Sequence, residues 1–291
     1  MTTTDPAGTR APLSSPPTSN PTTPAPRAGR SGPSPGGGGR LPVAVPVAIS
    51  LAWLAALLAE VTGTAGRFGH DAVLGQGPDR TALLAFLLAW QVMVVAMMLP
   101  SAIPLIRLFA GVAANQSGGA TPGGAAKGAA LDDHRHVRAL IGGYLAVWTA
   151  IGVVAFLADG AVHALVGAAP AIGTRPWLEA GALALAGAFQ FTALKDRCLA
   201  KCRHPAAYLL PRYRRGVDAA FRLGIAHGLF CVGCCWALML VMFAIGMADL
   251  RWMAALAAVM IYEKVGRHGV AAARLAGGAL LTLAAAVLAG G

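Results

Sequence analysis

The sequence has few charged residues, which account for 12% of its 291 positions. A soluble domain usually carries about 25%. Acidic residues are especially scarce, with 12 Asp and Glu against 23 Lys and Arg. The chain also has no nucleotide-binding loop, no Ser-His-Asp arrangement and no pair of carboxylates suited to acid–base catalysis. Nothing in it therefore indicates an ATP-driven motor or a hydrolase.

The cysteines and the basic residues exclude two further classes of protein. Five cysteines are an odd number, and none falls in a segment expected outside the cell, which argues against a secreted disulfide framework. A net charge of +11 would suggest a nucleic-acid partner, but no RNA- or DNA-binding motif is present. The Lys and Arg residues cluster between apolar runs instead, which is typical of membrane proteins whose basic loops meet anionic lipid headgroups.

Long apolar runs take the place of the missing charge, and 56% of the residues are hydrophobic. Runs of about 20 apolar residues predict transmembrane helices. We predict an all-α fold, a polytopic transmembrane helical bundle of about seven spans in the lipid bilayer. The expected spans are residues 43–61, 81–106, 139–158, 177–194, 223–247, 250–266 and 270–289. The sixth is the weakest, because only Trp252 to Tyr262 is fully apolar, so six spans remain an alternative.

Composition also divides the chain. Residues 1–42 are rich in Pro, Ser, Thr and Gly and predict a disordered tail, which leaves 43–291 as the transmembrane domain. The Gly- and Ala-rich stretch 110–130 predicts a flexible cytoplasmic loop insert. With a cytoplasmic N-terminus, 19 of the 23 Lys and Arg fall on the cytoplasmic side. The positive-inside rule therefore predicts a multi-pass protein of the cell (inner) membrane, with its C-terminus outside.

The fifth expected span contains three of the five cysteines. At ~100° per residue, His227, Cys231, Cys234 and Met242 share one helical stripe, and Cys235 lies at its edge. One helix face thus carries an imidazole, thiols and a thioether, which are soft or borderline metal ligands. A single helix cannot surround an ion, because Cys234 and Cys235 diverge by about 100°.

The second expected span is the candidate that completes such a site. Met93 and Met97 lie one turn apart, on a face shared with Trp90. At ~1.5 Å per residue, Met93 lies roughly 18 Å from the outer end of its span, and Cys234 lies roughly 17 Å from the inner end of its own. Both positions are near the bilayer midplane. The alternative is that the methionines only fill an irregular core.

Cys198 and Cys202 form a separate pair, spaced i, i+4 in a basic segment. If the helix continues to Pro205, both thiols share a face, and the nearby cations favour the thiolate that binds metal or attacks disulfides. Two buried small residues are the alternative. For Glu263 and Lys264, an interfacial ion pair is the default expectation, although charge inside a span also hints at function.

Four blocks of residues resemble a known family. They are Trp90-x-x-Met93 with Ala96-Met97-Met98-x-Pro100 and Pro104; Gln190 with Leu194-Lys195-x-x-Cys198-Leu199-x-x-Cys202-Arg203-x-Pro205; Gly224-x-x-His227-Gly228-x-x-Cys231-x-Gly233-Cys234-Cys235-Trp236 with Met239; and Gly246-Met247, Trp252-Met253 and Glu263-Lys264. Together they span about residues 85–270 and resemble the bacterial predicted metal-binding integral membrane proteins, whose biochemical function is unassigned. The resemblance implies a helical membrane protein that binds metal, and it names no substrate.

Three functions follow. The first is binding of a soft transition metal, most simply Cu(I), for transfer, storage or insertion, with a metallochaperone or copper enzyme as partner; zinc also suits Cys and His. The second is a membrane thiol oxidoreductase, although a disulfide between adjacent cysteines is strained. The third is a non-catalytic subunit of a membrane complex. The candidate metal ligands are His227, Cys231, Cys234, Cys235, Cys198, Cys202, Met93, Met97 and Met242.

Overall fold

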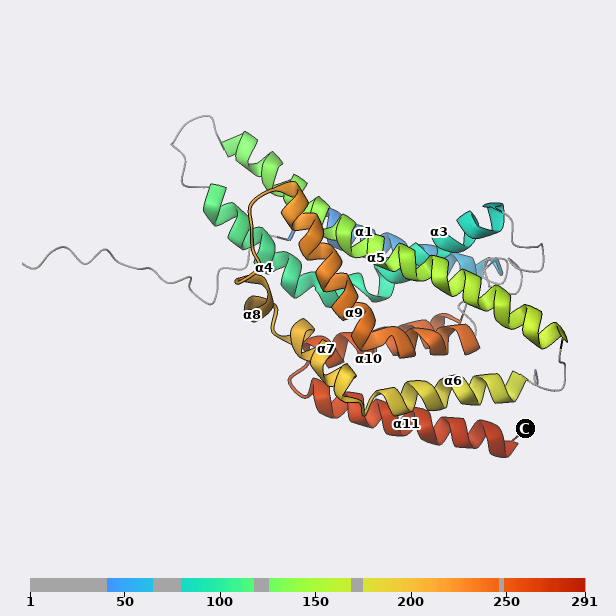
Figure 1. Cartoon of the computed structure of the whole chain (residues 1–291). Helices are drawn as coiled ribbons and strands as arrows, with labels where there is room; N and C mark the ends of the chain where they lie inside the picture. The colour runs from blue at the N-terminus through green and yellow to red at the C-terminus, as the bar shows by residue number, and fades with distance from the viewer. Residues whose placement is uncertain (1–40, 65–79, 118–125, 169–174, 246–248, 291) are drawn as a thin grey trace, which may run out of the picture. The chain divides into compact units, whose positions relative to one another are not determined.

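The structure is a computed structural model that describes residues 41–64, 80–117, 126–168, 175–245 and 249–290. These residues form α-helices joined by short connections, and they contain no strand. The helices are α1 (Ala44–Val61), α3 (Arg80–Met97), α4 (Leu99–Ser117), α5 (Ala126–Ala168), α6 (Arg175–Phe189), α7 (Ala193–Arg203), α8 (Pro205–Leu209), α9 (Val217–Ile245), α10 (Leu250–Val265) and α11 (Gly269–Gly290) (Figure 1). The expected all-α fold is confirmed for this part of the chain. Nearly all of the expected tail lies outside it.

Five helices in the described residues are long and apolar enough to cross a membrane, or six if the bent pair α6 and α7 counts as one span. Five expected spans therefore correspond to α1, α3, α5, α9 and α11, and the expected span 177–194 corresponds to the bent pair. The expected span 250–266 is α10, with 16 residues. The count of about seven remains a prediction, because α10 is shorter than a usual span.

The expected span 81–106 is interrupted at Met98, which lies in a turn between α3 and α4. The cause is Pro100, which has no N–H to donate to the carbonyl of Ala96 one turn earlier. The Trp53 indole of α1 donates to that carbonyl instead, at 3.1 Å. The Ser101 hydroxyl donates to the Met98 carbonyl at 2.7 Å. Protein groups thus bond the Ala96 and Met98 carbonyls at the break. The break also points the Met98 side chain in a direction that it would not have in a continuous helix.

A second break turns α7 away from α6 by 66°. α7 begins after Thr192, whose side chain accepts a hydrogen bond from the Lys195 backbone N–H at 3.2 Å. The carbonyl of Gln190, inside the break, accepts from the Arg274 guanidinium of α11 at 2.8 Å. This bend directs α7 onto α9, against which it packs.

The expected flexible insert at 110–130 is helical at both ends. α4 continues to Ser117, and α5 already begins at Ala126. Helix extends into both ends of the expected insert because alanine is the strongest helix former, and the flexible loop itself stays a prediction. Residues 118–125 lie outside the described residues.

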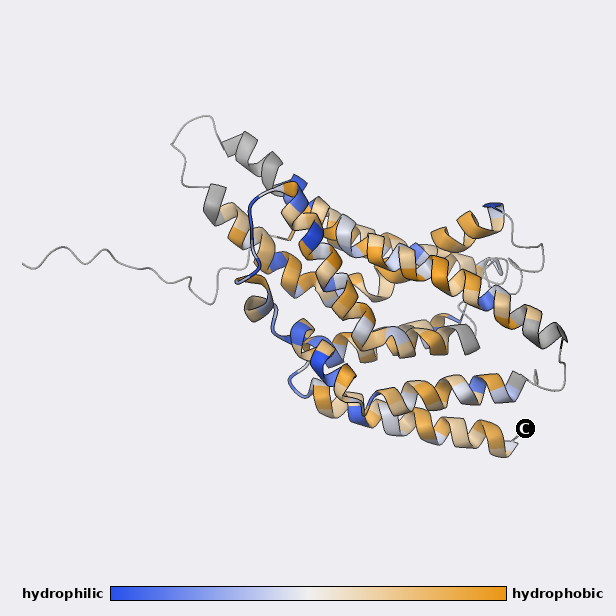
Figure 2. Cartoon of the chain, viewed as in Figure 1, coloured by the Kyte–Doolittle hydropathy of each residue, from blue (hydrophilic) through white to orange (hydrophobic). Residues whose placement is uncertain are grey.

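The centre of the bundle is α9, which packs most extensively on α5 and also contacts α6, α7 and α10. Glycines allow the close approach of α5 and α9. A Cβ on Gly224 of α9 would come within 2.0 Å of the Leu140 carbonyl oxygen, and one on Gly143 of α5 within 2.1 Å of the Phe221 carbonyl oxygen. Figure 2 shows mostly apolar helices, with hydrophilic residues gathered on α7 and on the segment between α8 and α9.

This close approach gives a test of the fold. We expect Gly224→Ala to separate α5 from α9 and to lower stability by about 1–3 kcal/mol, the usual cost of overpacking. Gly181→Ala in α6 is the matched control, because a Cβ there meets open space and alanine favours helix. Thermal unfolding of the detergent-purified protein measures both. Equal unfolding temperatures for the two variants would contradict the packing described here.

Candidate metal centre

Three thiols gather at one level of α9. Cys231, Cys234 and Cys235 are each about 1% exposed. The thiols of Cys234 and Cys235 both donate to the Cys231 carbonyl, at 3.1 and 2.9 Å. Cys235, expected at the edge of the stripe, is therefore as buried as the other two. All three sulfur atoms turn toward the neighbouring helices rather than outward.

α7 brings the remaining two cysteines to the same place. The Cys202 thiol lies beside the Cys234 thiol. Cys198 lies against Gly233 of α9, where an added Cβ would come within 2.7 Å of the Cys198 sulfur. From sequence, these two cysteines were a pair apart from the three on α9. The bend between α6 and α7 merges the two groups into one thiol cluster, which we define as Cys198, Cys202, Cys231, Cys234 and Cys235.

The methionine that reaches this cluster is Met98. Its sulfur lies 3.7 Å from the Cys235 sulfur, across the break between α3 and α4. The expected ligands Met93, Met97 and Met242 are all buried in the apolar core. Among the described residues, none of these three makes such a contact with a cysteine. Sequence periodicity missed Met98 because it treated residues 81–106 as one straight helix.

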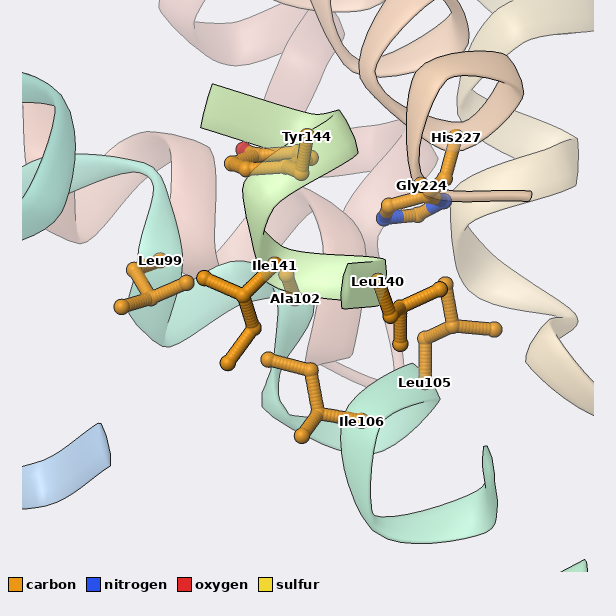
Figure 3. A pocket seen from close by; sticks show the side chains of 9 residues that line it. All are labelled: Leu99, Ala102, Leu105, Ile106, Leu140, Ile141, Tyr144, Gly224 and His227. Atoms are coloured by element: carbon orange, nitrogen blue, oxygen red, sulfur yellow. The ribbon is translucent and has the colours of Figure 1, made fainter. Parts of the chain in front are cut away.

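His227 lies one turn from Cys231 but among aromatic rings. Its imidazole stacks on Tyr144 with ring centroids 5.8 Å apart, and Tyr208 lies 6.0 Å away on another side. Figure 3 shows His227 and Tyr144 at the wall of a small pocket that is otherwise lined by aliphatic side chains and Gly224. The Tyr144 hydroxyl, 3.1 Å from the Cys231 sulfur, is the group that links this aromatic cluster to the thiols.

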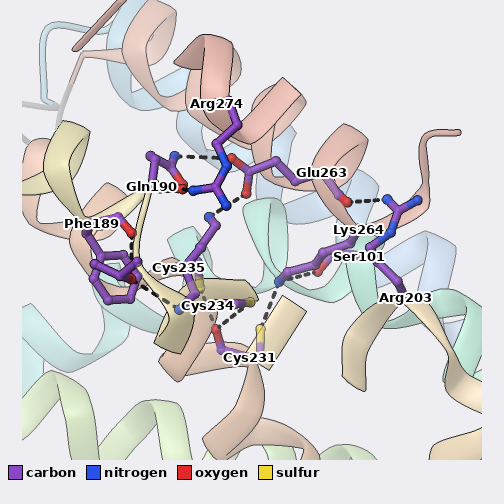
Figure 4. A network of polar contacts seen from close by, with 12 residues as sticks. Ser101, Phe189, Gln190, Arg203, Cys231, Cys234, Cys235, Glu263, Lys264 and Arg274 are labelled. Carbon is purple, nitrogen blue, oxygen red and sulfur yellow. Dashed lines mark hydrogen bonds and ion pairs between the residues drawn. The ribbon is translucent and has the colours of Figure 1, made fainter. Parts of the chain in front are cut away.

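A buried lysine also contacts the thiol cluster. The Lys264 ammonium of α10 donates to the Cys231 sulfur at 3.0 Å and to the Ser101 hydroxyl at 3.1 Å (Figure 4). Its side chain is 5% exposed. The sequence contained the signal, a lysine beside an apolar run, but the expected partner was Glu263. Successive helical residues diverge by about 100°, so Glu263 and Lys264 meet different neighbours.

Glu263 pairs instead with Lys195 of α7. Its carboxylate lies 2.6 Å from the Lys195 ammonium, and both side chains are almost fully buried. The Gln190 amide donates to the other carboxylate oxygen at 3.1 Å. The Arg203 guanidinium donates to the Glu263 carbonyl at 2.6 Å. These bonds connect α7 to α10 and so hold the two cysteines of α7 against α9. Figure 4 shows the Gln190 and Arg203 side chains bonded to Glu263.

The cysteine donors are close but not arranged around one point. All five cysteines are free thiols. Within the described ranges, no group of three or more His, Cys, Asp or Glu side chains is arranged to hold a metal ion. The thiols contact one another, Tyr144, Lys264 and the backbone instead. Their chemistry, thiol with one thioether, is nevertheless that of a site for a soft ion.

Comparison with known protein families identifies the family to which the chain belongs. The family PpoB2, described as "Copper chaperone", matches residues 87–287, which is more than half of the chain. The chain belongs to the PpoB2 copper chaperone family. No curated protein and no solved structure matches the chain. The match to PpoB2 covers the whole thiol cluster, Met98 and Lys264. It agrees with the metal-binding part of the expected resemblance and adds copper, which the resemblance alone did not name.

The ion pair in this PpoB2 protein gives a second test. We expect Glu263→Gln to lower stability by about 3–5 kcal/mol, because it leaves the Lys195 ammonium buried without its counter-charge. The double variant Lys195→Met/Glu263→Gln removes both charges and should regain part of that loss. Glu60→Gln, at an exposed position of α1, is the matched control. Thermal unfolding measures all three. A Glu263→Gln protein as stable as the control would contradict a buried ion pair.

Proposed function

We propose that this protein binds Cu(I) at the thiol cluster and passes it to another copper protein. The observation that carries the proposal is the contact between Cys202 of α7 and Cys234 of α9, because it joins thiols from two helices in the interior. Thiolate and thioether ligands favour Cu(I) over hard ions. The Met98 sulfur beside Cys235 favours copper over zinc, which gains little from a thioether. Membership of a family described as a copper chaperone supports the same cargo.

The proposal includes a membrane location. Leucines face outward along the candidate spans, for example Leu51 and Leu58 on α1 and Leu275 on α11. Such faces suit contact with acyl chains. Side chains from α1 and α11 bond the Ala96 and Gln190 carbonyls at the two helix breaks, as a hydrocarbon environment requires. The basic segments then lie in the cytoplasm, with the N-terminus inside. A C-terminus outside requires α10 to cross as well, and its 16 residues extend about 24 Å.

The expected partner is a metallochaperone or a copper enzyme that exchanges the ion with the thiol cluster. Arg203 and Lys201 lie on α7 itself, the helix that supplies Cys198 and Cys202. Under the topology proposed above, this helix is at the cytoplasmic side of the bundle. Metal exchange therefore takes place from the cytoplasm, where thiols stay reduced.

The first test removes the α9 thiols. Purified in detergent and loaded with Cu(I), the protein should hold about one or more copper ions per chain by elemental analysis. The variant Cys231→Ser/Cys234→Ser/Cys235→Ser should lose at least about nine-tenths of that copper, because serine is a hard and weak ligand for it. Undiminished copper in the triple variant would rule out the site. Thiols that cycle between free and disulfide forms under oxidant, seen by mass spectrometry, would instead indicate an oxidoreductase.

A second test distinguishes Met98 from Met93 as the methionine ligand. We expect Met98→Leu to weaken Cu(I) binding by about tenfold, through loss of the thioether beside Cys235, with little change in stability because leucine has similar volume. Met93→Leu is the matched control, because that methionine is also buried but packs in the apolar core. Competition with a Cu(I) chelator measures both affinities. If Met93→Leu weakened Cu(I) binding and Met98→Leu did not, the methionine ligand would be Met93, as helix periodicity predicts.

A further inference from the structure

The charges buried around the thiol cluster are unequal. In the described residues, the buried charged side chains are Lys195, Glu263 and Lys264. The first two neutralise each other at 2.6 Å. Lys264 has only uncharged partners or sulfur, namely the Ser101 hydroxyl and Cys231. The buried charges around the thiols therefore sum to one positive charge, and the group in direct contact with it that can become negative is the Cys231 thiol.

Lys264 is held in place by the same segment that supplies the thioether. Its ammonium donates to Ser101, Ser101 donates to the Met98 carbonyl, and the Met98 sulfur touches Cys235. An ion bonded to the Cys231 sulfur at about 2.3 Å therefore lies no more than about 5 Å from the ammonium. At that range inside a protein, each added unit of positive charge is strongly disfavoured.

The number of thiolates decides which ion is balanced. A monovalent ion held by two thiolates carries a net charge of −1, which Lys264 cancels. A divalent ion on the same two thiolates is neutral and leaves the ammonium uncompensated in an apolar interior, which is costly. A divalent ion also prefers four ligands, whereas no group of three or more His, Cys, Asp or Glu in the described residues is arranged to hold one. Cu(I) and Ag(I) accept two ligands.

We propose that Lys264 is a specificity-determining residue that makes the thiol cluster a two-thiolate site for a monovalent soft cation and disfavours divalent ions. The inference rests on the proposed function and adds the basis of its selectivity. One of the two thiolates is that of Cys231, which receives the ammonium hydrogen bond. The other comes from a thiol in contact with it.

The test compares Ag(I) and Zn(II) as probes. Their affinities for the detergent-purified protein are measured by equilibrium dialysis with elemental analysis. In Lys264→Leu and Lys264→Gln, the Zn(II)-to-Ag(I) affinity ratio should rise on the order of a hundredfold, because a nearby unit charge is removed. Glutamine keeps a donor for Ser101, so agreement of the two variants separates charge from packing. Lys201→Leu, at an exposed position of α7, should leave the ratio unchanged.

A measurement on the unaltered protein completes the test and does not depend on any variant folding. X-ray absorption of the Ag(I)- or Cu(I)-loaded protein should find two thiolate sulfur neighbours, with the Met98 thioether as the only further sulfur. Four or more sulfur neighbours, or a ratio in the neutral variants within twofold of the natural protein, would overturn the proposed role of Lys264. Copper binding that still depends on the α9 cysteines would then leave the proposed function standing, so the two failures are distinguishable.

Discussion

The buried ion pair between Lys195 and Glu263 is the interaction on which the thiol cluster depends. Without it, α7 would have little reason to turn inward, because its sequence is the most polar of the helices described here. The pair also explains why two charges are tolerated in an apolar interior. Each has the other at 2.6 Å, and Gln190 adds a hydrogen bond to the carboxylate. A buried polar network of this kind favours one arrangement of the helices over its alternatives.

Periodicity and composition were enough for part of this arrangement. Long apolar runs predict helices, and the stripe of thiols on α9 follows from 100° per residue, so the burial of Cys231 and Cys234 could be foreseen. The position of α7 could not, because it depends on Lys195 and Glu263, which are 68 positions apart in sequence. His227 lies on the same stripe, but it is one turn, about 5.4 Å, away from Cys231 along α9. At that position its imidazole stacks on the Tyr144 ring.

Both helix breaks occur where the candidate centre is built. Pro100 ends α3 and frees Met98, while the turn after Phe189 directs α7 and its cysteines toward α9. If the helices cross a membrane as proposed, non-helical backbone requires partners from the protein itself. Trp53 of α1 and Arg274 of α11 are such partners. When residues 81–106 are treated as one straight helix, Met93 and Met97 are predicted as the methionine ligands, because the break at Met98 is not taken into account. The proline that disturbs periodicity is also the residue that creates the contact with Cys235.

The thiols already have hydrogen-bonding partners within the protein, and this bears on what a copper chaperone must do. Cys231 receives the Lys264 ammonium and lies against the Tyr144 hydroxyl, and Cys234 and Cys235 donate to a carbonyl. Under the proposed function, copper entry exchanges these hydrogen bonds for metal–sulfur bonds instead of filling an unpaired site. These hydrogen bonds are lost when the ion binds and form again when it leaves. The net free energy of binding is therefore smaller than that of the metal–sulfur bonds alone. A thiol cluster whose hydrogen-bonding partners compete with the metal suits a protein that transfers the metal to another protein.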